Sequence, residues 1–194
     1  MNFLGHLFFS NNDLDLMIAN LYGDSVKGTK YKHYSKPIQQ GIKLHRKIDS
    51  YMDHHPDVKK LRMHLYKDLP KIAGVAVDLM FDHLLAKKWD EFHHKKLDVF
   101  LEEFYNHRSP LELEMTSDFL FLLKQMRESK WMNYYPTLYG LEKSALGVSR
   151  RISFKNKLQD TPRAYLEHQR IIEETFYVYM KDAMNELTYE IDMT

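Results

Sequence analysis

Hydrophobic positions recur three and four residues apart along nearly the whole chain, and strict alternation of apolar and polar residues is scarce. The first spacing places apolar side chains on one face of an α-helix, whereas alternation would indicate strands. We therefore predict an all-α fold of about eight helices in a single compact domain that spans residues 1–194. The expected helices cover residues 13–22, 37–53, 57–68, 71–89, 96–107, 110–128, 136–148 and 163–188.

One of these helices carries polar residues where burial is expected. The stretch VAVDLMFDHLLAKKW (75–89) is nearly all apolar, yet Asp78 and Asp82 lie one turn apart in line with Leu85 and Trp89. Two buried like charges cost several kcal/mol unless something offsets them. The offsetting group would be Arg or Lys, a shared proton or a bound metal.

The segment PIQQGIKLHRKIDSYMDHH (37–55) shows the same pattern. Ile38, Ile42, His45, Asp49 and Met52 follow one another at spacings of four and three, so they share one helical face. His45 and Asp49 therefore occupy positions typical of a core.

Two further polar residues come from the N-terminal segment. His6 stands among aromatic and leucine side chains, and Asp24 follows the expected end of a helix. An acid is unfavourable at the negative end of a helix, and a bound cation would reverse that penalty. We predict that these groups converge on one divalent metal, for which imidazole and carboxylate ligands favour Mn²⁺, Fe²⁺ or Zn²⁺ over Ca²⁺. Such a metal would activate a water and polarise a phosphoryl oxygen, with one His or Asp as general base or acid.

Each pattern also has a structural interpretation, which stays open at this point. A lone histidine on an apolar face is usually hydrogen-bonded in the core, and a His–Asp pair one turn apart often forms a structural hydrogen bond. Asp78 and Asp82 would in that case cap a neighbouring helix or pair with Arg150 and Arg151.

Composition and charge exclude several classes of protein. The net charge is +1, which does not favour nucleic-acid binding by the whole molecule, and the absence of cysteine excludes disulfides and thiolate ligands. The N-terminal segment does not read as a signal peptide, and no apolar run reaches 18 residues. We expect a cytoplasmic protein without a membrane or nucleic-acid partner; its oligomeric state is open.

Several short motifs, in order along the chain, resemble those of the acyl carrier protein phosphodiesterase family. MNFLGHL at the N-terminus is similar to the family's N-F-L-A-H-L, and GDSVKG (23–28) to D-F-[VIL]-[KR]-G. LHRKID (44–49) matches H-R-x-I-D, and DLMFDHLL (78–85) matches D-x-x-x-D-H-F-L. SKWM (129–132) and SRR (149–151) also fall where the family has similar segments. The chain departs from the family pattern at Gly5, Ser25 and Leu84. These are packing positions, so the departures concern how the substrate fits more than the chemistry of the reaction.

The resemblance implies a reaction and a set of site residues. Family members hydrolyse the phosphodiester that joins 4′-phosphopantetheine to a serine of holo-acyl carrier protein, with a divalent metal, typically Mn²⁺; Mg²⁺ or Fe²⁺ would be alternatives. They look distantly related to helical HD-type phosphohydrolases, although Asp82-His83 has the opposite order to the His-Asp dipeptide that names that group. Carried over to this chain, the expected metal ligands are Asp24, His45, Asp78 and Asp82, and the expected catalytic residues are His6, Asp49 and His83.

Basic residues between positions 24 and 47 offer a docking surface for an acyl carrier protein, which is small and acidic. The expected substrate-binding residues are Lys27, Lys43, Arg46, Lys47, Arg150 and Arg151, the two last as phosphate ligands. Two alternatives remain: an HD-like nucleotide phosphohydrolase, and a non-catalytic helical module that binds acyl carrier protein.

Overall fold

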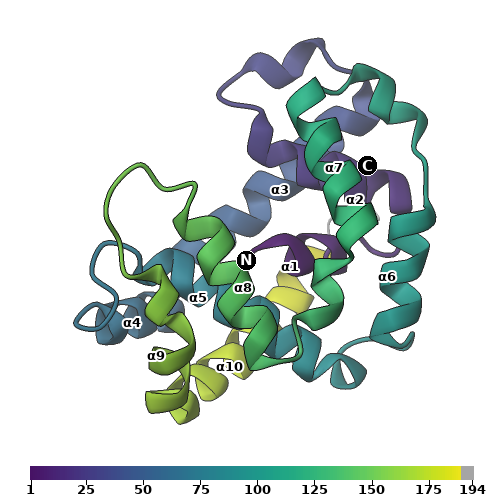
Figure 1. The fold of residues 1–194 in the computed structure, drawn as a ribbon. Helices are drawn as coiled ribbons and strands as arrows, with labels where there is room; N and C mark the ends of the chain where they lie inside the picture. The colour runs from purple at the N-terminus through teal and green to yellow at the C-terminus, as the bar shows by residue number, and fades with distance from the viewer. Residues whose placement is uncertain (189–194) are drawn as a thin grey trace.

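The structure, a computed structural model, describes residues 1–188 and contains α-helices and short 3-10 turns, with no strand in that range. The prediction of an all-α fold is confirmed (Figure 1). The α-helices of the described range are α1 (Phe3–Phe8), α2 (Leu14–Tyr22), α3 (Lys36–His54), α4 (Pro56–Leu65), α5 (Ala73–Lys87), α6 (Leu97–Asn106), α7 (Ser117–Ser129), α8 (Leu138–Ser149), α9 (Thr161–Glu167) and α10 (Gln169–Thr188). The 3-10 turns are η1 (Gly23–Ser25), η2 (Lys30–His33), η3 (Trp89–Glu91), η4 (Pro110–Glu114), η5 (Trp131–Tyr134) and η6 (Leu158–Asp160).

The described chain has ten α-helices where the pattern predicts about eight. Helix α1 was not predicted, because its six residues are too few to show a repeat. The expected helix 110–128 is divided, since a capping box between Ser109 and Glu112 closes a 3-10 turn before α7 begins. The expected helix 163–188 is divided at His168, whose φ of −115° and ψ of 18° leave helical geometry. Such short breaks leave the spacing of apolar residues almost intact, so periodicity does not reveal them.

Helix α5 forms the centre of the core. Eleven of its 15 residues are buried, and it packs against α1, α4, α8, α9 and α10. Because neighbours surround it, each of its polar side chains must find a partner on another helix.

Helices α2 and α3 lie against each other at very close range. A Cβ at Gly41 would clash with the backbone of Ala19, so glycine is required at this contact. The close approach brings the next turns of α3, with His45 and Asp49, beside the N-terminal helices (Figure 1).

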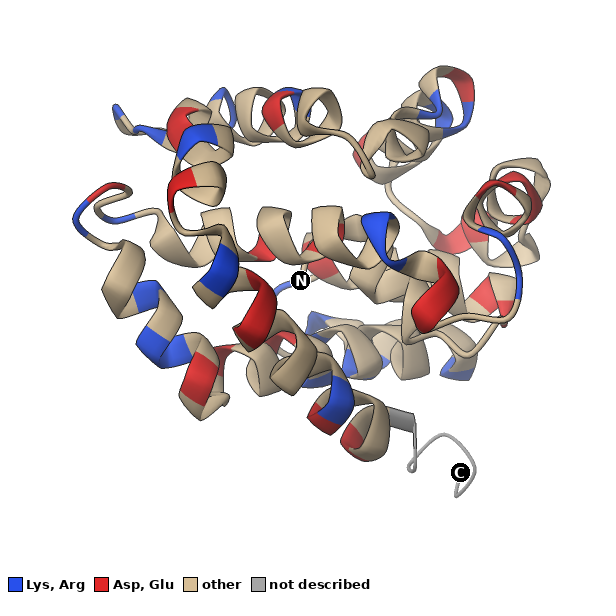
Figure 2. Ribbon diagram, turned by 90° about the horizontal axis from the view of Figure 1, so that it is seen from below, with Lys and Arg blue, Asp and Glu red and all other residues tan. Residues whose placement is uncertain are grey.

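Charges of both signs are interspersed over the helices on the face seen from below (Figure 2). None of the described helices is long and apolar enough to span a membrane.

Candidate active site

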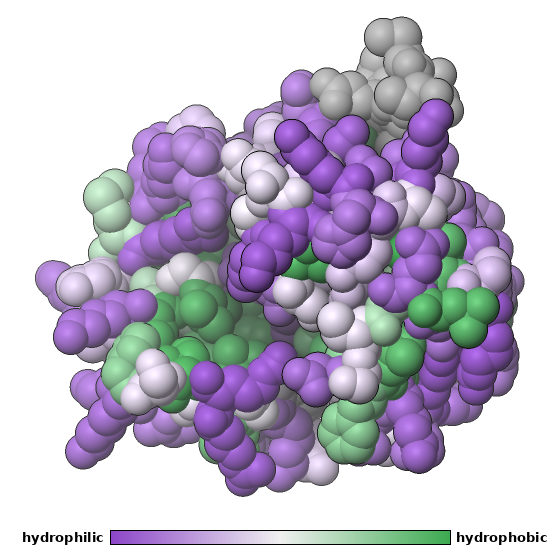
Figure 3. Space-filling view, turned by 90° about the horizontal axis from the view of Figure 1, so that it is seen from above, coloured by the Kyte–Doolittle hydropathy of each residue, from purple (hydrophilic) through white to green (hydrophobic). Residues whose placement is uncertain are grey.

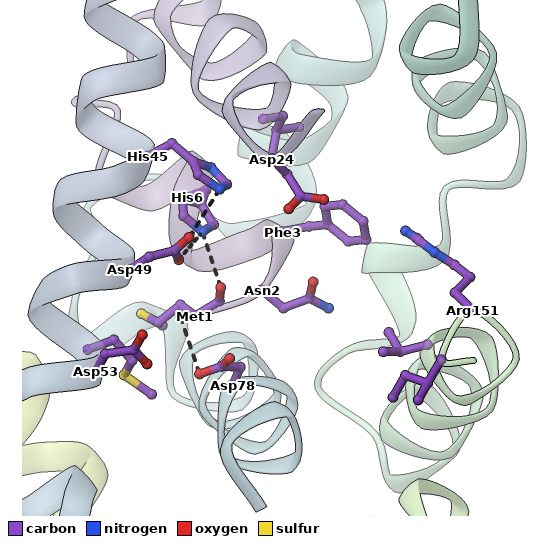
Figure 4. Close-up of a pocket in the computed structure, with 14 residues that line it drawn as sticks. Met1, Asn2, Phe3, His6, Asp24, His45, Asp49, Asp53, Asp78 and Arg151 are labelled. Carbon is purple, nitrogen blue, oxygen red and sulfur yellow. Dashed lines mark hydrogen bonds and ion pairs between the residues drawn. The ribbon is translucent and has the colours of Figure 1, made fainter. Parts of the chain in front are cut away.

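A polar cavity of about 360 Å³ opens between α1, α3, α5 and the segment after α8 (Figure 4). Its lining residues are Met1, Asn2, Phe3, His6, Leu21, Asp24, His45, Asp49, Met52, Asp53, Asp78, Val148, Arg151 and Ile152. Five of the seven residues expected to be catalytic or metal-binding are among them. Asp82 and His83 are not.

His6, on α1, is buried and has its ring orientation fixed by Asn20. The Asn20 amide nitrogen donates to the His6 carbonyl at 2.9 Å and to the Ser10 hydroxyl at 3.0 Å. The amide oxygen of Asn20 therefore faces the His6 ring, 3.0 Å from Nδ1, and must accept a hydrogen bond from it. The Nδ1 atom of His6 carries the proton, and Nε2 of the neutral ring presents a lone pair.

The surroundings of this lone pair are electron-rich. His6 Nε2 lies 3.1 Å from the carbonyl oxygen of Met1 and 3.2 Å from Oδ1 of Asp49. Burial lowers the pKa of His6 to about 4, although the Asp49 carboxylate opposes the shift, so the ring is neutral near pH 7. A neutral ring with its proton on Nδ1 cannot donate to either oxygen. A cation among these three atoms would convert their repulsion into coordination.

His45 and Asp49 lie one turn apart on α3 and complete the cluster. His45 Nε2 is 3.2 Å from Oδ2 of Asp49, and the His45 ring stacks on the His6 ring with centroids 4.1 Å apart. Burial by itself would raise the pKa of Asp49, but the hydrogen bond from the His45 imidazole holds that pKa below its usual range. Asp49 is therefore ionised. The backbone of Gly23 lies so close to His45 that a Cβ there would clash with the ring.

These three side chains fit a divalent metal. One ligand atom from each of His6, His45 and Asp49 lies within 4.8 Å of the other two, and His45 Nδ1 is buried without a hydrogen-bond partner in the described chain. Two imidazoles and a carboxylate suit Mn²⁺, Fe²⁺ or Zn²⁺. The hydrogen bond from His6 Nδ1 to Asn20 is the second contact that metal-bound histidines usually make.

Asp78 lines the cavity. The cations that accompany its carboxylate are not Arg150 and Arg151, the pairing considered from the sequence. Its Oδ1 lies 3.5 Å from the amino nitrogen of Met1 and 3.6 Å from Nη2 of Arg62. Burial raises the pKa of Asp78, and both cations oppose that shift. The expectation that a positive group accompanies this carboxylate is met by these two groups.

Asp82 is buried and turned away from the cavity, toward the start of α1. Its Oδ2 accepts the N–H of Leu4 at 2.7 Å, and its Oδ1 accepts those of Asn2 at 3.2 Å and Gly5 at 3.1 Å. The residue at the N-cap position, Asn2, supplies no side-chain cap of its own. Asp82 thus caps α1 from another helix, which is the structural interpretation left open above. Its geometry does not bring it to the predicted metal centre.

His83 also lies outside the cavity. Its Nδ1 donates to the carbonyl oxygen of Tyr135 at 2.7 Å, and its ring meets the Tyr165 ring edge-on, with centroids 5.0 Å apart. Burial lowers the pKa of His83, which keeps the ring neutral. This placement connects α5 to η5 and α9 and gives His83 no access to a substrate in the cavity.

Asp24 stands at the mouth of the cavity with 73% of its side chain exposed, and Lys27 lies 4.0 Å from it. Lys43 is exposed on α3, two residues before His45. Lys27 therefore lies near the mouth of the cavity, whereas Lys43 does not share the helical face of His45.

Arg46 and Lys47 have contacts within the fold. Arg46 donates to the carbonyl of Val26 at 2.9 Å and lies over the Tyr31 ring, 4.9 Å from its centroid. Lys47 donates to the carbonyl of Glu186 at 3.3 Å. To bind the substrate as predicted, both side chains would have to give up these contacts.

Of the two arginines after α8, the structure brings only Arg151 to the cavity, opposite His6, His45 and Asp49 (Figure 4). Arg150 is exposed and does not line the cavity.

The pattern did not single out three residues at this site. Asp53 follows Asp49 by one turn, and its Oδ1 accepts a hydrogen bond from Nη1 of Arg62 at 2.7 Å. The four-residue spacing would have revealed Asp53 as an extension of the same face. Nothing in the spacing of Arg62 or Asn2 distinguishes them from surface residues.

The model of the family described as acyl carrier protein phosphodiesterase matches residues 1–183. The chain belongs to this family. Relatives named acyl carrier protein phosphodiesterase include those of Salmonella agona (strain SL483) and Salmonella newport (strain SL254), each 26% identical over 181 residues. A third, from Salmonella dublin, is 25% identical over 178 residues, and in all three cases the match covers 91% of this chain and 92% of the relative.

Membership of the family confirms the resemblance predicted from the motifs and makes the chain a phosphodiester hydrolase. No solved structure matches the chain, so the kinship with HD-type phosphohydrolases stays a prediction.

Proposed function

We propose that this chain hydrolyses the phosphodiester of holo-acyl carrier protein to give apo-acyl carrier protein and 4′-phosphopantetheine, with a divalent metal held by His6, His45 and Asp49. Mn²⁺ is the metal we favour. Family membership supports the substrate. The main support for a bound metal is the lone pair of His6 Nε2, which faces two oxygen acceptors at 3.1 and 3.2 Å.

The charge of the cavity supports the same proposal. Four aspartates line it, against Arg151 and the amino group of Met1. A phosphodiester is an anion and would be repelled from this set of carboxylates. A divalent cation held by His6, His45 and Asp49 would offset the repulsion, polarise a phosphoryl oxygen and lower the pKa of a water.

The side chains of the cavity have separate roles in the reaction. Arg151 faces the cluster from the opposite wall and binds a phosphoryl oxygen through its guanidinium group. The oxygen of a water forms a bond to phosphorus while the bond to the serine Oγ breaks. A cavity carboxylate accepts the proton from the water and then passes it to the serine Oγ, which leaves as a hydroxyl group. Lys27 at the mouth of the cavity and the exposed Lys43 on α3 supply positive charge for an acidic carrier protein.

The test is the intact mass of holo-acyl carrier protein after incubation with the protein, with Mn²⁺ or with a chelator. We expect conversion to the apo mass with Mn²⁺, and a loss of rate of about 100-fold or more in Asp49→Asn and His45→Ala. Asp98→Asn, on the exposed side of α6, serves as the matched control and should convert as the wild type does.

Conversion that persists after complete removal of metal would overturn the metal centre. Failure of folded, Mn²⁺-loaded protein to convert holo-acyl carrier protein would overturn the substrate. The two parts of the proposal therefore fail separately.

A further inference from the structure

A second cavity, of about 650 Å³, lies beside the polar one and has a different character. Its walls are mainly apolar, include five aromatic side chains, and come largely from the start of α1, from η5 and from α8. We call it the aromatic groove; its defining residues are Phe3, Trp131, Tyr134, Tyr135, Tyr139 and Gly147. On the face seen from above, Figure 3 shows hydrophobic residues gathered in a hollow bordered by hydrophilic ones.

The two cavities adjoin each other. Asn2, Phe3, Val148 and Arg151 line both of them. In Figure 4, Phe3 and Arg151 lie on the side of the polar cavity away from His45 and Asp49. A chain attached to a phosphate beside Arg151 would therefore leave the polar cavity past Phe3 and enter the groove.

We infer that the aromatic groove binds the pantetheine arm of the substrate and positions the phosphodiester for hydrolysis. This inference rests on the proposed function. The scissile phosphate joins two parts: a folded protein, too large for either cavity, and a slender uncharged arm with two methyl groups and two amides. The groove has the mostly apolar lining, with a few polar groups such as Lys143 and Ser144, that suits such an arm.

Gly147 supports this assignment. It lies inside α8, where glycine is less favourable than alanine, and it does not have the positive φ that would require glycine. A Cβ there would meet no atom within 4 Å, so close packing does not require glycine either. Gly140 on the same helix differs, because a Cβ there would clash with the carbonyl of Tyr134. With both of these reasons excluded, the effect of glycine at position 147 is that no side chain fills the groove there.

Gly147→Phe tests the inference, because it fills the groove from a helix position that tolerates a side chain. We compare holo-acyl carrier protein with bis(4-nitrophenyl) phosphate, a small diester without the arm. We expect Gly147→Phe to lower the ratio of kcat/KM for the carrier protein to kcat/KM for the small diester by about tenfold or more, mainly through KM. Gly147→Ala should have a much smaller effect. Glu142→Phe, which adds the same ring at an exposed position outside the groove, should leave the ratio unchanged.

Direct binding gives a second readout. The chain has two tryptophans, and Trp89 is buried outside both cavities, so a fluorescence change on titration with 4′-phosphopantetheine reports on Trp131. We expect a saturable change in the wild type and in Glu142→Phe, and loss of that change in Gly147→Phe.

The outcomes separate the groove from the proposed function. Wild-type rates on holo-acyl carrier protein in Gly147→Phe would overturn the groove and leave the function intact. An equal loss on both substrates would also overturn it, since the defect would then lie in the metal centre. A wild-type protein that hydrolyses the small diester and not holo-acyl carrier protein would overturn the proposed substrate, and the groove assignment with it.

Discussion

Asp82 on α5 accepts the backbone N–H of Leu4 on α1 at 2.7 Å, and this hydrogen bond joins the helix that carries His6 to the centre of the fold. The same carboxylate accepts two further N–H groups at the start of α1. A residue outside the cavity therefore fixes the position of His6, the proposed metal ligand, inside it.

Asp82→Ala should destabilise the protein and weaken metal binding together. Three N–H groups lose their acceptor, which should lower the free energy of unfolding by on the order of 3 kcal/mol. His6 should then be less well positioned, so Mn²⁺ affinity should fall as well. Urea denaturation and calorimetric Mn²⁺ titration measure the two effects, with Asp90→Ala, exposed in η3, as the control. Unchanged values for both would show that the cap does not hold α1.

The pH dependence of stability should carry a contribution from Asp82. Burial raises the pKa of Asp82 to about 7, although the N–H groups of Leu4 and Gly5 oppose the shift. Because the folded pKa lies above the unfolded one, the contribution is fully present below the unfolded pKa and is lost as pH rises through about 7. Over that window the free energy of unfolding should fall by about 1.4 kcal/mol per pH unit relative to Asp82→Asn, which cannot ionise. Urea denaturation of metal-free protein between about pH 5 and about pH 8 tests this; parallel curves for the two proteins would contradict it.

Asn20→Ala should weaken metal binding by removing the acceptor that orients the His6 ring. We expect Mn²⁺ affinity to fall by about 10- to 100-fold. Ser10→Ala is the matched control, because it removes a buried partner of Asn20 without touching the His6 ring. Equal losses of affinity in the two variants would mean that general destabilisation, and not ring orientation, is responsible.

His83→Ala distinguishes the role predicted from the family motif from the one its contacts indicate. Loss of the hydrogen bond to Tyr135 should cost on the order of 1 kcal/mol of stability, while kcat and KM of the folded protein stay near wild-type values. Thermal unfolding and steady-state kinetics measure both quantities. A large fall in kcat in a variant with a native fold would restore the predicted catalytic role.

Docking of an acidic carrier protein should depend on charge near the cavity. Lys27→Glu and Lys43→Glu should raise KM for holo-acyl carrier protein with little change in kcat, and added salt should raise the KM of the wild type in the same way. Lys181→Glu, on α10, is the control for net charge and should leave KM near its wild-type value. A KM that does not respond to salt would exclude electrostatic docking.

Local spacing was enough to predict the helical class and much of the site. The pairing of His45 with Asp49 follows from a four-residue interval, because such residues always share a face of a helix. The apolar neighbours of His6 and the position of Asp24 after a helix end also singled out two residues that line the cavity. Together with the family motifs, these local signals identified His6, Asp24, His45, Asp49 and Asp78 correctly as neighbours of one another.

Tertiary structure alone decided which of the buried polar residues of α5 face the cavity. Asp78 and Asp82 lie on one side of the helix but about 6 Å apart along its axis, which is enough for each to meet a different neighbour. Asp78 meets the amino group of Met1 and Arg62, whereas Asp82 meets the start of α1. The sequence by itself determined that these carboxylates need compensation, because burial of charge is costly wherever it occurs. It did not determine what compensates them, since that depends on helices that are distant in sequence and are brought together only by packing.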